Sequence, residues 1–161
     1  MYSTIATCLT PPCPKSHPKK LWRFRTATEF SQADVSAVRF GLQHTSLKDE
    51  RWAFAREGHP ADAISMMIGE WPVGRISHRV DAIMTAIVLA ALMGSAASTL
   101  VAYHTIAQLA FRRPRLREIA ASWLVVVEEQ ERRRFWHPTA SDAIPRSSDD
   151  VRSPFPGRSY A

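Results

Sequence analysis

The feature that most constrains this chain is a long stretch without a charged residue. It runs from Ala82 to Phe111, AIMTAIVLAALMGSAASTLVAYHTIAQLAF, and is bounded by Asp81 and by an arginine-rich run. A helix of this length extends roughly 45 Å, whereas the hydrocarbon core of a bilayer is about 30 Å thick. The sequence therefore predicts one long apolar helix over residues 77–112, with a membrane span centred on residues 83–103.

Small residues recur at every fourth position of this predicted helix. Close approach of two helices in lipid depends on such small side chains, because burial from water no longer drives association there. The row predicts a helix-packing surface and a homo-oligomer or a place in a larger membrane complex. Its members are Ala86, Ala90, Gly94, Ser98 and Ala102.

An arginine-rich helix is predicted to follow over residues 113–137. Its apolar stripe includes Trp123, and arginines occupy positions 112, 113, 115 and 117. A basic amphipathic helix with a tryptophan is typical of contact with an anionic lipid leaflet. Nucleic-acid binding, with arginines on phosphates, is the less favoured alternative, and a solvated basic face is a third. The candidate residues for the anionic surface are Arg112, Arg113, Arg115, Arg117 and Trp123.

Short helices are predicted over residues 28–76, between two tails that we expect to be disordered. Its first helix is expected to start at Ser31, which has Asp34 at capping-box spacing. Pro60 and Ser77 are also expected at helix starts. Gly58 is expected to end a helix in the left-handed conformation. Residues 1–27 and 138–161 hold most of the prolines, which disfavour regular structure. The predicted fold class is all-α.

Composition narrows the chemistry without identifying a reaction. The chain of 161 residues has a formal net charge of +6, which favours an anionic partner. Its two cysteines, Cys8 and Cys13, match no zinc spacing with His17, and no metal or cofactor is predicted. Common nucleotide-binding and hydrolase motifs are absent, so we do not expect an enzyme. The acid-free N-terminus resembles a transit peptide, which leaves an organellar membrane open.

Two functional hypotheses follow from these features. The first is a small single-pass membrane protein of the cell or inner membrane, with a structural, accessory or assembly role through helix packing. Four arginines after the apolar stretch favour a cytoplasmic C-terminus, but the basic N-terminal half would then have to be translocated, so the orientation stays open. The second is a soluble helical dimer that binds nucleic acid or a protein through its arginines, with the apolar helix as its core.

Overall fold

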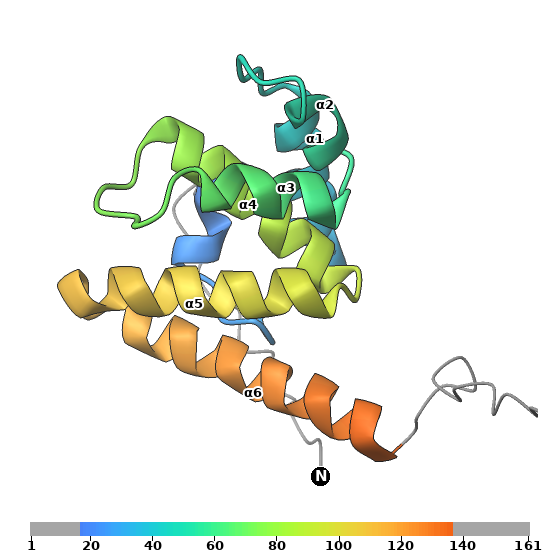
Figure 1. Ribbon diagram of the computed structural model, residues 1–161, viewed down its shortest axis with the longest axis vertical. Helices are drawn as coiled ribbons and strands as arrows, with labels where there is room; N and C mark the ends of the chain where they lie inside the picture. Colours follow the sequence, from blue (N-terminus) through green and yellow to red (C-terminus); the bar gives the residue numbers. More distant parts are fainter. Residues whose placement is uncertain (1–16, 137–161) are drawn as a thin grey trace, which may run out of the picture.

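The computed structural model describes residues 17–136. This part of the chain contains no strand, so the predicted all-α class is confirmed for it (Figure 1). Its seven helices are the 3-10 helix η1 (Pro18–Arg23) and the α-helices α1 (Gln32–Gln43), α2 (Trp52–Ala55), α3 (Pro60–Ile68), α4 (His78–Leu92), α5 (Ala96–Arg112) and α6 (Leu116–Trp136). The predicted C-terminal tail and residues 1–16 of the N-terminal tail lie outside the described residues.

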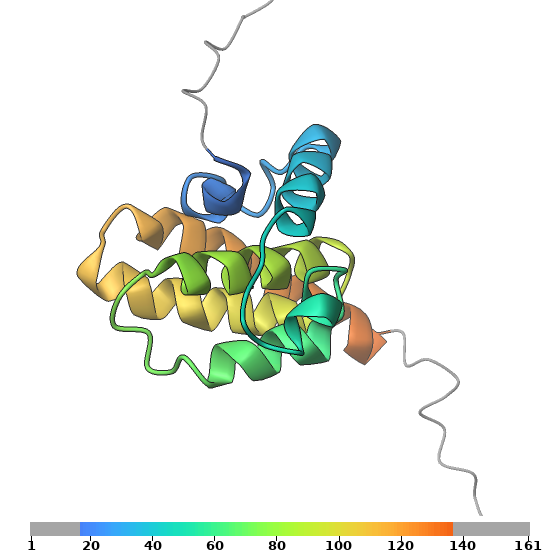
Figure 2. The same ribbon diagram turned by 90° about the horizontal axis from the view of Figure 1, so that it is seen from above.

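Helix α4 is the centre of the fold. Every residue from Val80 to Ala91 is buried, and η1, α1, α3 and α5 all contact this helix. Figure 2 shows α4 between η1 and α1 on one side and α3 on the other. A helix that is apolar on all sides needs neighbours all round, and the short N-terminal helices together with α5 supply them.

A turn at Gly94 divides the uncharged stretch into two helices. Gly94 has φ +99°. Its N–H donates to the carbonyl of Ala91 at 2.9 Å, and the N–H of Ser95 donates to the carbonyl of Ala90 at 3.0 Å. This pair of bonds is the Schellman motif, in which a left-handed residue ends a helix. The Ser95 hydroxyl then accepts from the N–H of Ser98 at 3.2 Å and caps α5.

This turn overturns the predicted membrane span. Helix α4 has 15 residues and α5 has 17, so they extend about 23 and 26 Å, less than the roughly 30 Å of a hydrocarbon core. Across residues 17–136, no helix combines the length and the apolar character that crossing a bilayer requires. The prediction of a single-pass membrane protein in the cell, inner or an organellar membrane is therefore wrong. The apolar surface of α4 is covered by the chain itself.

The predicted N-terminal tail also needs correction from residue 17 onwards. Pro18 occupies the start of η1, and Leu21 and Trp22 are 6% and 1% exposed. The Thr85 hydroxyl of α4 donates to the carbonyl of Lys19 at 2.8 Å, which ties the two helices together. Residues 17–27 are thus part of the folded structure, and Leu21 and Trp22 belong to its core. Their prolines suggested an unstructured segment, although proline fits the first turn of a helix.

Several predicted helix ends are present in the structure. Ser31 and Asp34 form a reciprocal capping box at the start of α1. Ser77 accepts from the N–H of Val80 at 3.1 Å and caps α4. Pro60 begins α3, and Gly58 adopts φ +98° just before it. These signals are local, and hydrogen bonds within three or four residues satisfy them.

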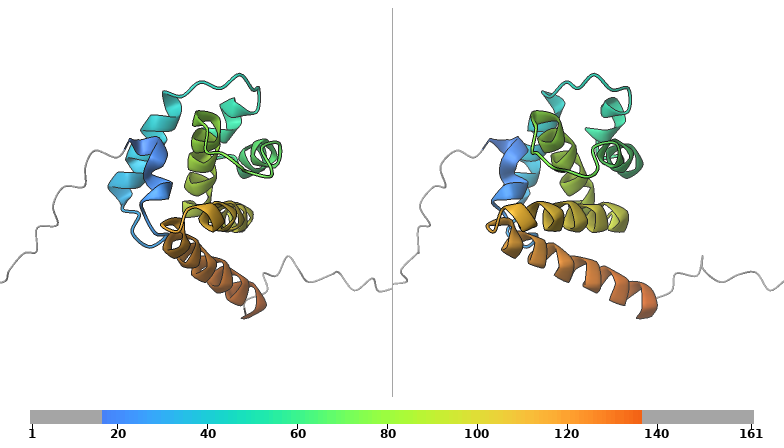
Figure 3. Two further views of the ribbon diagram at one scale, coloured as in Figure 1. Left: turned by 90° about the vertical axis from the view of Figure 1, so that its left-hand side faces the viewer. Right: turned by 60° about the vertical axis from the view of Figure 1, so that its left-hand side comes forward.

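Helix α6 forms the outer layer of the molecule and packs on α5 (Figure 3). Its buried residues are Leu116, Ile119, Ala120, Trp123 and Val127, at helical spacing on one face. Trp123 is 1% exposed and belongs to the hydrophobic core. On its outer face Glu129 pairs with Arg133 at 3.1 Å.

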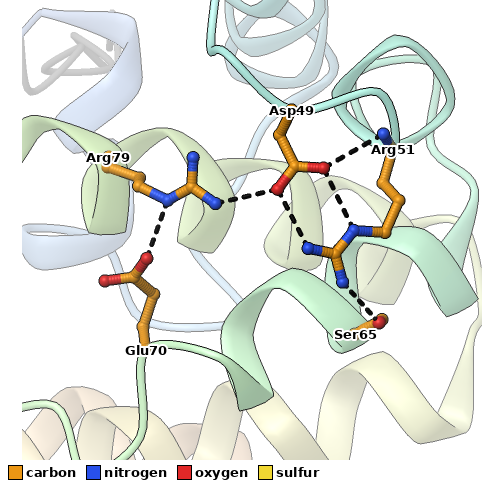
Figure 4. Close-up of polar contacts among 5 residues, drawn as sticks. All are labelled: Asp49, Arg51, Ser65, Glu70 and Arg79. Atoms are coloured by element: carbon orange, nitrogen blue, oxygen red, sulfur yellow. Dashed lines mark hydrogen bonds and ion pairs between the residues drawn. The ribbon is translucent and has the colours of Figure 1, made fainter.

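An ion-pair network fixes the loops around α3 and α4 (Figure 4). The Asp49 carboxylate accepts from Nε and Nη2 of Arg51, both at 3.0 Å, and from Nη2 of Arg79 at 2.9 Å. Arg79 Nε also donates to Glu70 at 2.7 Å, and Arg51 donates to the Ser65 hydroxyl at 2.8 Å. These guanidinium bonds, those from Arg51 first, hold the pKa of Asp49 well below its usual range.

Candidate functional site

Three segments that are distant in sequence meet at one end of the molecule, which the left panel of Figure 3 brings towards the viewer. They enclose a cleft of about 450 Å³. We call this region the basic end. The cleft is lined by Arg23 and Phe24 after η1, by Ile76 before α4, and by Arg113, Pro114, Arg115 and Leu116 between α5 and α6.

The α5–α6 turn presents the arginines because its apolar residues anchor it. Pro114 cannot continue α5, and Arg113 before it adopts an extended conformation with φ −136° and ψ 87°. Leu116, 4% exposed, starts α6 against the core. The turn therefore has Leu116 buried on its inner side, whereas Arg113 and Arg115 are exposed.

The loop before α4 is held against the end of α5. The N–H of Val73 donates to Oε1 of Gln108 at 3.3 Å, and Arg112 Nη1 donates to the carbonyl of Gly74 at 3.4 Å. This contact brings Ile76 into the wall of the cleft. It also occupies Arg112, so Arg113 and Arg115 are the arginines of the turn that face the cleft.

Arg23 is fixed by a partly buried ion pair. Its Nε donates to Oδ1 of Asp81 at 2.8 Å, and its Nη2 pairs with Oδ2. The Asp81 and Arg23 side chains are 7% and 19% exposed. A guanidinium held in this bidentate way has one orientation, with its remaining surface towards the cleft. Asp81 therefore positions Arg23 without neutralising the exposed arginines beside it.

Arg23 pairs with Asp81, but the arginines of the α5–α6 turn carry positive charge that no acidic group of the described residues neutralises at close range. Among the residues that the structure describes, no carboxylate lies within ion-pair distance of Arg112, Arg113 or Arg115. Glu29 and Glu118 border an adjoining hollow and mark the edge of the positive region. Exposed arginines without a partner are available to an anionic ligand.

Two exposed phenylalanines flank these arginines. Phe24 is 58% exposed and lines the cleft, and Phe111 is 88% exposed at the end of α5. Neither residue was predicted from the sequence to belong to a site. The position of Phe111 directly before an arginine run was a signal that could have found it. Phe24 lies in the segment predicted to be a tail and carried no such signal.

The predicted anionic-surface residues do not remain together. Arg113 and Arg115 line the cleft of the basic end, Arg112 lines a neighbouring hollow beside Gly74, and Arg117 lines a groove between α5 and α6. Trp123 is buried in the hydrophobic core, so it is not available to a surface. The four arginines of this short segment thus lie in three different surroundings.

The predicted helix-packing row is also divided. Ala86 and Ala90 are buried in α4, Ser98 and Ala102 are buried in α5, and Gly94 forms the turn between them. The four buried residues contact other parts of the same chain and offer no surface to a second molecule.

Within residues 17–136, no cluster of three or more His, Cys, Asp or Glu side chains is arranged to hold a metal ion. Cys8 and Cys13 lie outside the described residues.

The basic end can hold an anionic group beside an apolar or planar one. The guanidinium groups suit phosphate or carboxylate oxygens, and the walls of Phe24, Ile76 and Pro114 suit a ring. A cleft of about 450 Å³ falls within the usual range of ligand pockets.

Comparison of the chain with protein-family models, with curated proteins and with solved structures finds no match.

Proposed function

We propose that this protein binds single-stranded nucleic acid at the basic end, in a binding rather than a catalytic role. The observation that carries the proposal is the cleft whose lining combines Arg23, Arg113 and Arg115 with the exposed ring of Phe24. Proteins that bind single strands combine a positive groove for the phosphates with aromatic rings on which bases stack. The basic end provides both within one cleft.

The phosphate contacts are assigned to the exposed arginines. Arg113 and Arg115 are exposed on the α5–α6 turn and have no ion-pair partner in the described part of the chain. Binding of phosphates to such groups releases counterions, so affinity falls as salt rises. Each phosphate contact contributes a slope of about 0.7 in a plot of log K against log salt for single strands.

The base contact is assigned to Phe24. Its ring is 58% exposed although apolar, and it lies beside Arg113 and Arg115 in the wall of the cleft. A base stacked on an aromatic ring contributes about 1–3 kcal/mol. Bases in a duplex are already stacked on one another, so this contact favours a single strand over a duplex of the same sequence.

The test is fluorescence anisotropy of a labelled oligothymidylate, titrated with the full chain over a range of salt concentrations. We expect the double variant Arg113→Gln/Arg115→Gln to reduce the salt slope by about 1.4. Phe24→Ala is expected to weaken binding by roughly 5- to 150-fold with the slope unchanged. The matched control is Arg132→Gln/Arg133→Gln, which removes the same charge where both arginines pair with Glu129.

Three results would overturn the proposal. An equal loss of affinity in the test and control double variants would mean that net charge alone drives binding. Equal affinity for the duplex would contradict the role of Phe24. Binding to vesicles containing phosphatidylserine, without binding to the oligonucleotide, would assign the basic end to lipid headgroups.

A further inference from the structure

A groove between α5 and α6 lies apart from the cleft of the basic end. It has a volume of about 350 Å³ and is mainly apolar. Its lining includes Tyr103, Ala107 and Phe111 of α5, and Arg117, Ala121 and Leu124 of α6. A helix pair that exposes an apolar groove has room for further helices, because side chains of a second pair can fill it.

One face of α6 has a regular pattern along this groove. Arg117, Ala121, Leu124, Glu128 and Glu131 follow one another at alternating spacings of four and three residues. This is the repeat by which one helix packs along another in a coiled coil. The face is basic at its N-terminal end, apolar in the middle and acidic at its C-terminal end.

The charged residues of this face have no partner within the described part of the chain. No ion pair involves Arg117, Glu128 or Glu131 there, whereas Glu129 nearby pairs with both Arg132 and Arg133. Arg117, Glu128 and Glu131 are all exposed. Their charges are therefore available to a second molecule.

We propose that a second copy of this chain docks on the groove, with the two α6 helices antiparallel and Leu124 near the twofold axis. Arg117 and Glu131 are equally far from Leu124 along α6, so the rotation places Arg117 of each copy opposite Glu131 of the other. Seven residues correspond to about 10 Å, so one ion pair forms on each side of the axis. A parallel arrangement would instead oppose like charges.

The α5 side of the groove fits the same arrangement. Phe111, 88% exposed, lies at the end near Arg117, and Leu100, 41% exposed, lies beside Glu131 at the other end. The twofold rotation superimposes the Phe111 end of one copy on the Leu100 end of the other. This isologous contact covers apolar side chains that the single chain leaves in water.

This inference does not depend on the proposed nucleic-acid function. The antiparallel arrangement places the two basic ends at opposite ends of the dimer, with Arg113 and Arg115 outside the contact. The oligomeric state is therefore measured without nucleic acid, and either proposal can fail while the other stands.

The experiment is sedimentation equilibrium of the full chain and of charge-reversal variants. We expect the unmodified chain to dimerise. Arg117→Glu places Glu opposite Glu131, and Glu131→Arg places Arg opposite Arg117, so each variant alone is expected to raise the dimer Kd by about 10- to 100-fold. An equimolar mixture of the two variants restores both pairs, so we expect a heterodimer of near-normal affinity.

Arg133→Glu is the matched control, because Arg133 is exposed on a different face of α6 and pairs with Glu129. We expect this variant to dimerise like the unmodified chain, with all variants giving the same circular dichroism spectrum. A chain that stays monomeric at the highest concentration reached would overturn the proposal. So would a dimer that Arg117→Glu does not weaken, or a mixture of the two variants that fails to form a heterodimer.

Discussion

Replacing Gly94 by alanine tests the turn on which the whole fold depends. Gly94 has φ +99°, a region in which a Cβ atom meets the backbone of its own residue. If the stretch from Ala82 to Phe111 were one continuous helix, the same replacement would favour the helix, since alanine is the best helix former and glycine a poor one. The sign of the stability change therefore distinguishes the two arrangements.

The magnitude follows from the surroundings of Gly94. A Cβ atom built on this residue meets no other atom within 4 Å, so alanine causes no clash. The whole effect is then backbone strain, which is about 1–2 kcal/mol for a non-glycine residue in the left-handed region. A continuous helix would instead be stabilised by about 0.5–1 kcal/mol.

The assay is urea denaturation followed by far-ultraviolet circular dichroism, with the midpoint and slope fitted for each variant. We expect Gly94→Ala to lower the free energy of unfolding by about 1–2 kcal/mol with an unchanged slope. Asparagine tolerates the left-handed region better than alanine does, so Gly94→Asn is expected to lower the free energy of unfolding by less than Gly94→Ala does.

Gly69→Ala is the matched control. Gly69 has φ −65° and ψ −19°, which alanine adopts without strain, and its added Cβ lies 3.4 Å from the carbonyl of Met66. We expect its free energy of unfolding to stay unchanged or to rise by up to about 1 kcal/mol, through a less flexible unfolded chain. If Gly94→Ala also raised the free energy of unfolding, the turn between α4 and α5 would be refuted.

Two further predictions concern the ion pairs around α4. Asp49→Asn removes charged hydrogen bonds from Arg51 and Arg79 and is expected to lower the free energy of unfolding by about 1–3 kcal/mol at pH 7. Folding lowers the pKa of Asp49, so the stabilisation by its charge is fully present above the ordinary pKa of 3.8 and is lost as the pH falls through the lowered pKa. Urea titrations at pH 7 and pH 3 should therefore show a smaller difference in free energy of unfolding between variant and wild type at pH 3. Asp81→Ala leaves Arg23 without its partner and should lower the free energy of unfolding by about 3 kcal/mol in the same assay. A decrease below roughly 0.5 kcal/mol would contradict the positioning of Arg23 by Asp81.

The ends of the helices were largely predictable from sequence. Ser31 with Asp34, Pro60 and Ser77 act where the local rules place them, because a cap bonds to backbone groups within three or four residues. The same rules could have found the turn at Gly94, where a glycine is followed directly by a capping serine. The length of the uncharged stretch favoured a continuous helix instead.

The sequence by itself determined the all-α class of residues 17–136, an apolar segment that needs cover on every side, and a cluster of arginines that includes positions 113 and 115. Only the tertiary structure decided what covers that segment. Lipid and the chain's own side chains are equally apolar, so the hydropathy of α4 cannot distinguish them. The answer depends on Leu21 and Trp22 of η1, which pack against α4 from a segment distant in sequence. The same holds for the basic end, because Arg23, Ile76 and Arg113 form one cleft only after folding brings them together.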